Sequence, residues 1–191
     1  MTRPIGNSKS ERCREFSFPS QLQSTDVTDS VKWKDAQSLR ELCTLTADWL
    51  RGEVEGSPSY PGSPAPETHE IDDSLIRLNE SGLLTTSSQP AGIGEGWGQR
   101  AFVDGFASEE NALRIDVKAL YSDLHILTFP PGEGGGYPTP VTVSEGEPTT
   151  WNGHVEHEDM VESFGWCSEG ALDELRSAWF VVVIDLRWGR K

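Results

Sequence analysis

Hydrophobic and polar positions are patterned most regularly between residues 83 and 129. From Trp97 to Phe106 the side chains alternate with a period of two, which predicts a strand. Ser108 is a suitable N-cap, and Glu109 and Glu110 follow it where the helix dipole favours negative charge. The apolar residues behind this cap follow a 3.6-residue period and predict a helix with one buried side: Leu113, Val117, Leu120, Tyr121 and Leu124.

Other apolar runs predict strands. Residues 125–129 precede two prolines and are predicted as a short buried strand. This strand, the helix before it and the alternating segment are compatible with a right-handed crossover. The continuous apolar run from Trp179 to Ile184 is typical of a strand in the middle of a sheet. Residues 83–89 and 141–144 are predicted as further strands.

Further helices are indicated by apolar spacing and terminal residues. Ser38 is a plausible N-cap, Glu41 would complete a capping box, and Gly52 would end that helix. Ser168 similarly precedes a helix near the C-terminus. The predicted helices span about residues 38–51, 70–81, 156–164 and 168–177.

The connections are rich in proline and glycine. Residues 53–68 contain four prolines and are interpreted as a tethering loop, with a polyproline recognition segment as the alternative. Residues 130–140 would be a lid or binding loop. Residues 148–153 are predicted as a turn.

Together these segments predict an α+β fold: a single small mixed sheet of about four to five strands, with three to five helices packed against it. Residues 1–30 are polar and lack periodicity, so we expect a disordered, flexible N-terminal tail. Residues 31–191 would then form a single α+β domain.

Charge limits the possible partners. The net charge is -15, and residues 35–191 carry 27 acidic against 10 basic side chains. Such a surface repels polyanions, so we expect no direct duplex nucleic-acid binding by the folded domain. The simplest interpretation of the charge is solubility, and the alternative is the binding of a basic partner.

Cysteine usage and hydropathy indicate a cytoplasmic protein. The three cysteines, Cys13, Cys43 and Cys167, are odd in number and show no CxxC spacing, so neither disulfides nor a thiolate zinc site is predicted. No apolar run approaches the ~18 residues of a membrane helix, so no membrane association is expected.

No cofactor is predicted. The run Gly-Ile-Gly-Glu-Gly-Trp-Gly over residues 92–98 resembles a dinucleotide fingerprint, but no register supplies glycine at the sixth position and a strand follows. Its glycines fit a tight connection between two strands better.

Outside this run, the sequence gives only weak evidence for metal-binding or catalytic residues. His154, His157 and Glu158 could share one helix face as metal ligands, but a polar surface cluster is the favoured interpretation and no metal site is predicted. For nucleophilic catalysis, Cys167 could pair with either histidine. Alternatively, Ser87 or Ser88 could act with His125 and Asp104, although no local catalytic motif supports either set.

Charged residues inside the predicted strands are more informative, because buried charges are costly unless paired. Such residues form salt bridges at the sheet edge or line a polar cleft whose tryptophans could stack on a ligand ring. Both interpretations require the middle of the chain and the C-terminal strand to be neighbours in one sheet. The candidate ligand-binding residues are Gln89, Trp97, Arg100, Asp104, Trp151, Asp185 and Arg187.

Several short motifs resemble an uncharacterised actinobacterial protein family of unknown function. They are Trp33-x-x-Ala36, Thr85-x-x-Ser88-Gln89-Pro90, Thr150-Trp151-x-Gly153 and the terminal Trp188-Gly189-Arg190. The resemblance covers about residues 31–190. It implies a soluble bacterial protein and supplies no activity, cofactor or catalytic residue.

Three functional hypotheses remain. The first is a soluble intracellular binding or regulatory protein, whose polar, tryptophan-edged cleft takes a small polar ligand or a peptide. The second is a hydrolase or transferase that uses Asp104 or the His154/His157 pair. The third is an acidic protein-interaction module or nucleic-acid mimic.

Overall fold

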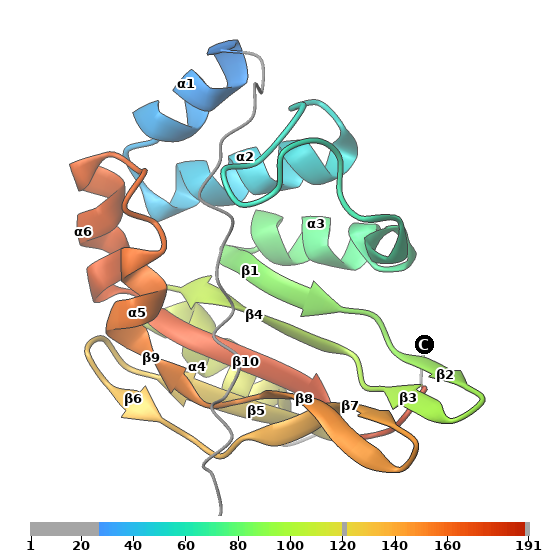
Figure 1. The fold of residues 1–191 in the computed structure, drawn as a ribbon. Helices are drawn as coiled ribbons and strands as arrows, with labels where there is room; N and C mark the ends of the chain where they lie inside the picture. Colours follow the sequence, from blue (N-terminus) through green and yellow to red (C-terminus); the bar gives the residue numbers. More distant parts are fainter. Residues whose placement is uncertain (1–26, 120–121, 190–191) are drawn as a thin grey trace, which may run out of the picture.

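Three sheets form the β part of the fold. The structure, a computed structural model, describes residues 27–119 and 122–189. The main sheet has the order β1-β4-β10-β5, the second sheet the order β2-β3-β7-β8, and β6 and β9 form a small third sheet (Figure 1). The α+β class is therefore confirmed, whereas a single mixed sheet is wrong: these three sheets are antiparallel throughout.

The elements follow one another along the described chain in this order: α1 (Val27–Asp35), α2 (Leu39–Arg51), the 3₁₀ helix η1 (Pro66–Glu70), α3 (Asp72–Glu80), β1 (Leu83–Gln89), β2 (Gly92–Gly94), β3 (Trp97–Gln99), β4 (Phe102–Ala107), α4 (Glu109–Ala119), β5 (Leu124–Phe129), β6 (Gly134–Gly135), β7 (Thr139–Ser144), β8 (Glu147–Asn152), β9 (Val155–Glu156), α5 (His157–Glu162), α6 (Glu169–Ser177) and β10 (Trp179–Asp185).

Two hydrophobic clusters lie on opposite faces of the main sheet. On one face Phe106 and Phe180 pack beneath α2, α5 and α6, and Val141 of the second sheet joins the same cluster. On the other face α4 packs against Val181 through Ala112. Each strand of the main sheet therefore contributes alternate side chains to one or the other layer.

The predicted neighbours in the sheet are confirmed. β10 lies between β4 and β5 and is antiparallel to both, with Val182 opposite Asp104. Because β10 is inserted between them, β4 and β5 are parallel to each other but not adjacent. The unit β4-α4-β5 is therefore a split strand–helix–strand unit.

The strand predicted from Trp97 to Phe106 is divided between two sheets. β3 belongs to the second sheet and β4 to the main sheet, with Arg100 and Ala101 between them. Backbone hydrogen bonds continue through this break, since Arg100 N donates to Val141 O and Ala101 O accepts from Asp185 N. The alternation was visible in the sequence, but the bend that moves the chain from one sheet to the other was not.

Helix caps confirm several predicted boundaries. Ser38 caps α2 by accepting from Glu41 N, and Gly52 ends it with φ 79°. Glu41 accepts from Gln37 N rather than from the N-cap residue, so the predicted capping box is only partly formed. Ser168 caps α6 by accepting from Ala171 N.

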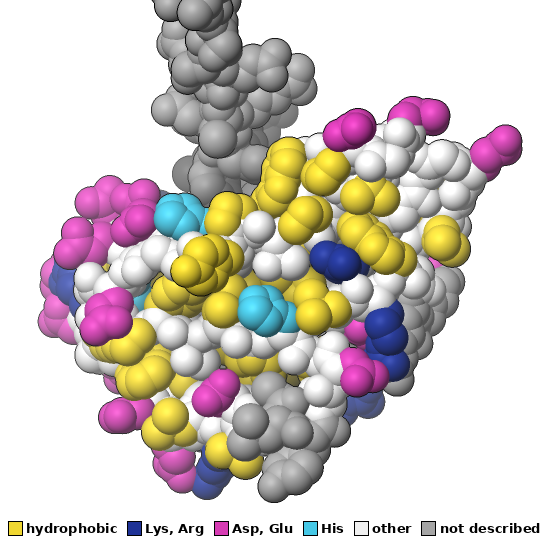
Figure 2. All heavy atoms as spheres, turned by 90° about the horizontal axis from the view of Figure 1, so that it is seen from below, with side chains coloured by type: hydrophobic (Ala, Val, Ile, Leu, Met, Phe, Trp, Pro, Cys, Tyr) yellow, Lys and Arg dark blue, Asp and Glu magenta, His cyan; other side chains and the backbone are white. Residues whose placement is uncertain are grey.

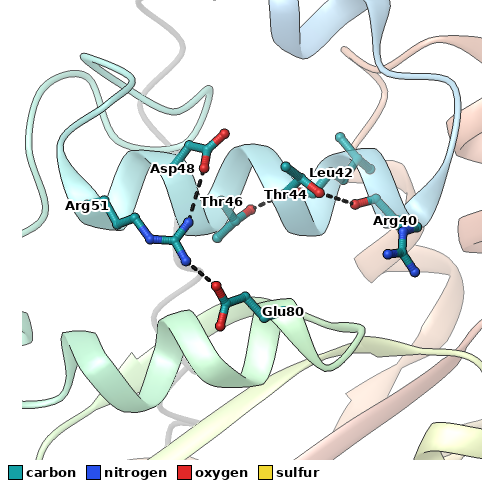
Figure 3. A network of polar contacts seen from close by, with 7 residues as sticks. All are labelled: Arg40, Leu42, Thr44, Thr46, Asp48, Arg51 and Glu80. Carbon is teal, nitrogen blue, oxygen red and sulfur yellow. Dashed lines mark hydrogen bonds and ion pairs between the residues drawn. The ribbon is translucent and has the colours of Figure 1, made fainter.

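Polar contacts also attach α2 to α3. Arg51 reaches from the last turn of α2 to Asp48 and to Glu80 of α3, while Thr44 and Thr46 donate back to carbonyls of their own helix (Figure 3). These contacts hold α2 against α3, and the buried face of α2 packs on β1.

Two predictions of local structure are wrong. Residues 148–153 are not a turn, because β8 continues through Asn152 and the turn lies at Glu145 and Gly146. In α4 the predicted apolar stripe is not buried: Leu113 and Val117 are 47% and 56% exposed. The small residue Ala112 is buried instead, which lets the helix approach the sheet closely. Leu120 and Tyr121 lie outside the described residues.

The predicted tail lies mostly outside the described residues. Its last four residues, 27–30, are nevertheless part of α1, so the tail prediction is wrong for them. Among the described helices, none has the length and apolar character needed to cross a membrane.

Candidate functional site

The β2–β3 hairpin presents a fixed tryptophan. Gly92 and Gly94 of β2 lie against the Trp97 indole, and a Cβ at Gly92 would come within 2.7 Å of that ring. Glycine in β2 therefore leaves space for the indole to lie flat across the neighbouring strand. Trp97 remains 44% exposed, so the other side of its ring is accessible.

Two carboxylates face the same region from the 3₁₀ helix η1. In a 3₁₀ helix side chains three positions apart are aligned, and Glu67 and Glu70 have this spacing. Both side chains are exposed. In the part of the chain that the structure describes, no partner is assigned to the Glu67 carboxylate.

These two features border one pocket of about 590 Å³. Its walls come from η1, the end of β1 and the β2–β3 hairpin. The lining residues are Glu67, Glu70, Ser88, Gln89, Pro90, Ala91, Gly92, Ile93, Trp97 and Gln99. We call this the hairpin pocket. It combines an aromatic face with two negative charges.

Two glutamines hold the walls of the hairpin pocket in place. Gln89 Nε2 donates to Arg100 O at 2.9 Å and to Val141 O at 3.2 Å. Gln99 Nε2 donates to Pro90 O at 2.6 Å. The Gln89 amide therefore connects β1 to the second sheet, and the Gln99 amide holds the segment that follows β1. The Glu67 carboxylate remains exposed at the pocket.

Arg100 has a structural position beside this pocket. Its Nε donates to Leu186 O at 3.0 Å and its Nη1 to Pro140 O at 2.8 Å. Its guanidinium also lies 4.1 Å from the centre of the Trp188 ring, a cation–π arrangement. Arg100 thereby links the segment between β3 and β4 to the start of β7 and to the C-terminal segment.

Asp104 lies inside the molecule and is only 6% exposed. Its carboxyl accepts from Thr86 Oγ1 at 2.6 Å, from Ser87 N at 2.9 Å and from Asn152 Nδ2 at 3.0 Å. Burial raises the pKa of Asp104 above its usual 3.8, and these hydrogen bonds act in the opposite direction. The carboxyl therefore links β1, at the point where its pairing with β4 shifts register, to the end of β8.

The remaining predicted ligand-binding residues are dispersed. Asp185 accepts from the backbone and side chain of Arg187, and Arg187 also contacts Asp123 at 2.9 Å. Trp151 lies on the edge strand β8 and is 53% exposed. Of the seven predicted residues, only Gln89 and Trp97 line the hairpin pocket.

The histidine cluster does not form as predicted. His154 precedes β9 and is 3.7 Å from Glu156, whereas His157 begins α5 and is buried. Within the fold, His157 Nδ1 faces Gly132 N and its Nε2 lies 2.8 Å from Ala178 O. Glu158 lines a separate surface hollow beside α5. Over the described residues, no group of three His, Cys, Asp or Glu side chains is placed to hold a metal ion.

The candidate nucleophiles are also separated from their proposed partners. Burial raises the pKa of Cys167 to about 12, which disfavours the thiolate that a cysteine nucleophile requires. Ser87 neighbours Asp104, but His125 lies on β5, on the far side of β10. Neighbouring strands are about 4.8 Å apart, so these three side chains do not form a catalytic set.

Sequence reasoning missed Glu67 and Glu70. Glu67 lies in the proline-rich segment that we interpreted as a tether, and Glu70 lies at the start of the helix predicted over residues 70–81. Nothing in their local pattern places either residue at the same pocket as Trp97. A weak signal was available in the β2 glycines, since two glycines opposite a tryptophan in a short hairpin indicate that a ring covers them.

Comparison with known proteins places the chain in an uncharacterised family, as predicted. Residues 28–191 match the model of a family described as a domain of unknown function (DUF6919). Methylenetetrahydrofolate reductase (NADH) 1 of Zea mays is 31% identical over 114 residues, and the probable methylenetetrahydrofolate reductase (NADH) of Oryza sativa subsp. japonica is 34% identical over 98 residues. These alignments cover 51% and 44% of this chain, but only 19% and 16% of the plant proteins.

Proposed function

The chain belongs to the DUF6919 family of domains of unknown function, and we propose that it is a binding or regulatory module for a small, positively charged ligand that carries a planar ring. The hairpin pocket is the proposed site. The observation that carries the proposal is the fixed Trp97 indole, which is seated on glycine and exposed on its other side next to two carboxylates.

The aromatic face supports a ring-containing ligand. A flat ligand can stack on the exposed side of Trp97, and an attached cation gains further attraction from the indole. Because Gly92 and Gly94 already fix the indole, little ordering of this side chain accompanies binding.

The carboxylates support selection by charge. Glu67 and Glu70 approach the pocket from η1, and the chain as a whole carries a net charge of -15. An ammonium or amidinium group can form charge-assisted hydrogen bonds with the exposed Glu67 carboxylate, whereas an anion is repelled. A basic side chain of a peptide partner meets the same conditions, so a small ligand and a peptide are both compatible.

The names of the plant relatives suggest other ligands, NADH and a reduced folate. Both of these molecules are anions. Glu67 and Glu70 make the hairpin pocket unfavourable for either, and the aligned segments are a minor part of the plant proteins. We therefore do not extend the reductase activity to this chain.

The surface gives less support to an acidic interaction module. On the face shown in Figure 2, hydrophobic side chains gather in the middle and acidic side chains lie mostly around the margin. This face of the described residues is therefore not the continuous acidic face that a nucleic-acid mimic presents.

A charge series tests the proposal. Benzylamine, benzyl alcohol and benzoate share one ring and carry charges of +1, 0 and -1 at neutral pH. We expect benzylamine to bind at least about tenfold more tightly than benzyl alcohol, which corresponds to about 1.4 kcal/mol, and benzoate not to bind. NADH and a reduced folate serve as the competing candidates in the same titration.

Two variants locate the site. Trp97→Ala and Glu67→Gln should each weaken benzylamine binding, while Trp151→Ala, which changes an exposed tryptophan outside the pocket, should not. Equal affinity for all three probes, or unchanged benzylamine binding by Trp97→Ala, would overturn the proposal.

A further inference from the structure

A second cavity lies at the other end of β1, beneath the proline-rich loop. It has a volume of about 90 Å³ and is walled by aromatic side chains from α1, α2, the loop and the segment after α5. The rings are Trp33, Trp49, Tyr60, Phe164 and Trp166. We call this cavity the aromatic cage.

The rings of the aromatic cage are held in defined orientations. Trp33 meets Trp166 edge to face at 6.0 Å, and Tyr60 stacks on Trp49 at 5.9 Å. The indole N–H of Trp33 donates to Gly56 O, and that of Trp49 donates to Gly62 O. With both N–H groups bound to the loop, these two rings have no remaining donor to offer a ligand.

The loop covers the cage and leaves it open to solvent at one side. Ser57 and Tyr60 bond each other's backbone in a tight turn that brings the Tyr60 ring over Trp49. Tyr60 is 51% exposed, so the rim of the cavity is accessible. The proline-rich segment is therefore part of a binding wall as well as a connection.

The chemistry of the lining restricts the ligand. Besides the rings and Met160, the lining consists of hydroxyl-bearing side chains, Pro58 and Leu84, and it includes no charged residue. Thr46 donates to Leu42 O, and Thr86 donates to the Asp104 carboxyl. Both hydroxyls thus direct their protons away and leave oxygen lone pairs available. The lining therefore combines aromatic rings with acceptor oxygens, and both attract a cation.

Size selects among cations. About 90 Å³ corresponds to about three water molecules and is smaller than the ~150 Å³ apolar cavity that admits benzene. The cavity is therefore limited to a small head group. A quaternary ammonium head carries no N–H and needs no hydrogen-bond partner, and a partly methylated head can donate its remaining N–H to the hydroxyl oxygens of the lining. Aromatic cages are a known means of binding such groups.

We propose that the aromatic cage is a second binding site and that it takes a quaternary or methylated ammonium group. The site is independent of the hairpin pocket, because the two share no lining residue. The proposal does not depend on the function assigned to that pocket.

Choline and its neutral carbon isostere, 3,3-dimethylbutan-1-ol, provide a matched test on the full chain. They have the same shape and differ in charge. We expect choline to bind with a Kd of about 1 mM, near the weak end of the affinity scale, with its N-methyl proton signals shifted upfield by the surrounding rings. The isostere should bind at least tenfold more weakly.

Two substitutions at Tyr60 make the test specific. Tyr60→Ala removes a half-exposed ring that the core does not require, and it should weaken choline binding at least fivefold. Tyr60→Phe keeps the ring and should bind as the unmodified protein does. Trp97→Ala should leave choline binding unchanged, since it alters only the hairpin pocket.

Three results would overturn the proposal. Equal binding of choline and its isostere would show a merely hydrophobic cavity. Absence of a choline-induced shift in the unmodified, folded protein would show that the cage does not bind this group. Choline binding that is lost with Trp97→Ala and retained with Tyr60→Ala would place the site in the hairpin pocket instead.

Discussion

The hairpin pocket and the junction between the two larger sheets contain similar residue types but use them differently. At the junction the carboxyl of Asp104 and the guanidinium of Arg100 have their hydrogen-bonding groups directed at the protein's own atoms. At the hairpin pocket the ring of Trp97 and the carboxylate of Glu67 are exposed. The comparison shows that a charged residue within a strand pattern, such as Arg100 or Asp104, can have its polar atoms bonded within the fold and so give no indication of a ligand site.

The largest effect is expected from removing the buried carboxyl at the junction. Asp104→Ala leaves Thr86 Oγ1, Ser87 N and Asn152 Nδ2 without an acceptor in a dry environment. The free energy of unfolding should fall by about 3 kcal/mol, since each buried unsatisfied donor costs about 1 to 3 kcal/mol and some will find water. Urea denaturation measures this change.

A matched control for that variant is Asp104→Asn, which keeps the shape and one acceptor oxygen. It should lose less than half as much stability as Asp104→Ala. If the two variants are equally stable and both resemble the unmodified protein, Asp104 is not a structural link and the comparison fails.

Arg100→Ala should have the next largest effect. It removes the hydrogen bonds to Leu186 O and Pro140 O and the contact with the Trp188 ring. We expect a loss of about 2 kcal/mol, because each hydrogen bond to a charged group contributes about 1.5 kcal/mol or more and the site is partly exposed. Arg100→Lys, which cannot reach both carbonyls in the same way, should recover only part of it.

The pH dependence of stability sharpens the account of Asp104. Burial raises its pKa in the folded protein above 3.8, so its protonated form favours folding. The stability of the unmodified protein relative to Asp104→Asn should therefore be greatest at and below about pH 3.8 and should fall as pH rises through the folded-state pKa. A constant difference between the two proteins across this range would contradict the assignment.

The smallest effect is expected at Trp151. Its side chain is half exposed on an edge strand, so Trp151→Ala should change the free energy of unfolding by no more than about 0.5 kcal/mol, as is usual for surface positions. A loss of more than 2 kcal/mol in thermal or urea unfolding would show that β8 depends on this ring.

Local signals in the sequence predicted much of the fold. Ser38 and Ser168 cap the helices that they were expected to cap, and the apolar run from Trp179 occupies the interior of the main sheet. These predictions succeeded because capping and burial depend on neighbouring residues and on simple periodicity.

The site was less predictable because it depends on contacts between distant segments. Arg100 lies in a strand-like pattern, yet the chain bends there and passes to a second sheet. Glu67 lines the same pocket as Trp97 only because the proline-rich segment ends in a 3₁₀ helix beside the hairpin. Neither the bend nor this approach has a local signature in the sequence.

The central claim is that the hairpin pocket binds the ligand and the junction holds the sheets together. Benzylamine affinity and unfolding free energy, measured side by side for Trp97→Ala and Arg100→Ala, test it most directly. We predict that Trp97→Ala loses at least about tenfold in affinity and at most about 1 kcal/mol in stability, while Arg100→Ala loses about 2 kcal/mol and keeps its affinity. Loss of affinity in Arg100→Ala with unchanged binding in Trp97→Ala would contradict the account.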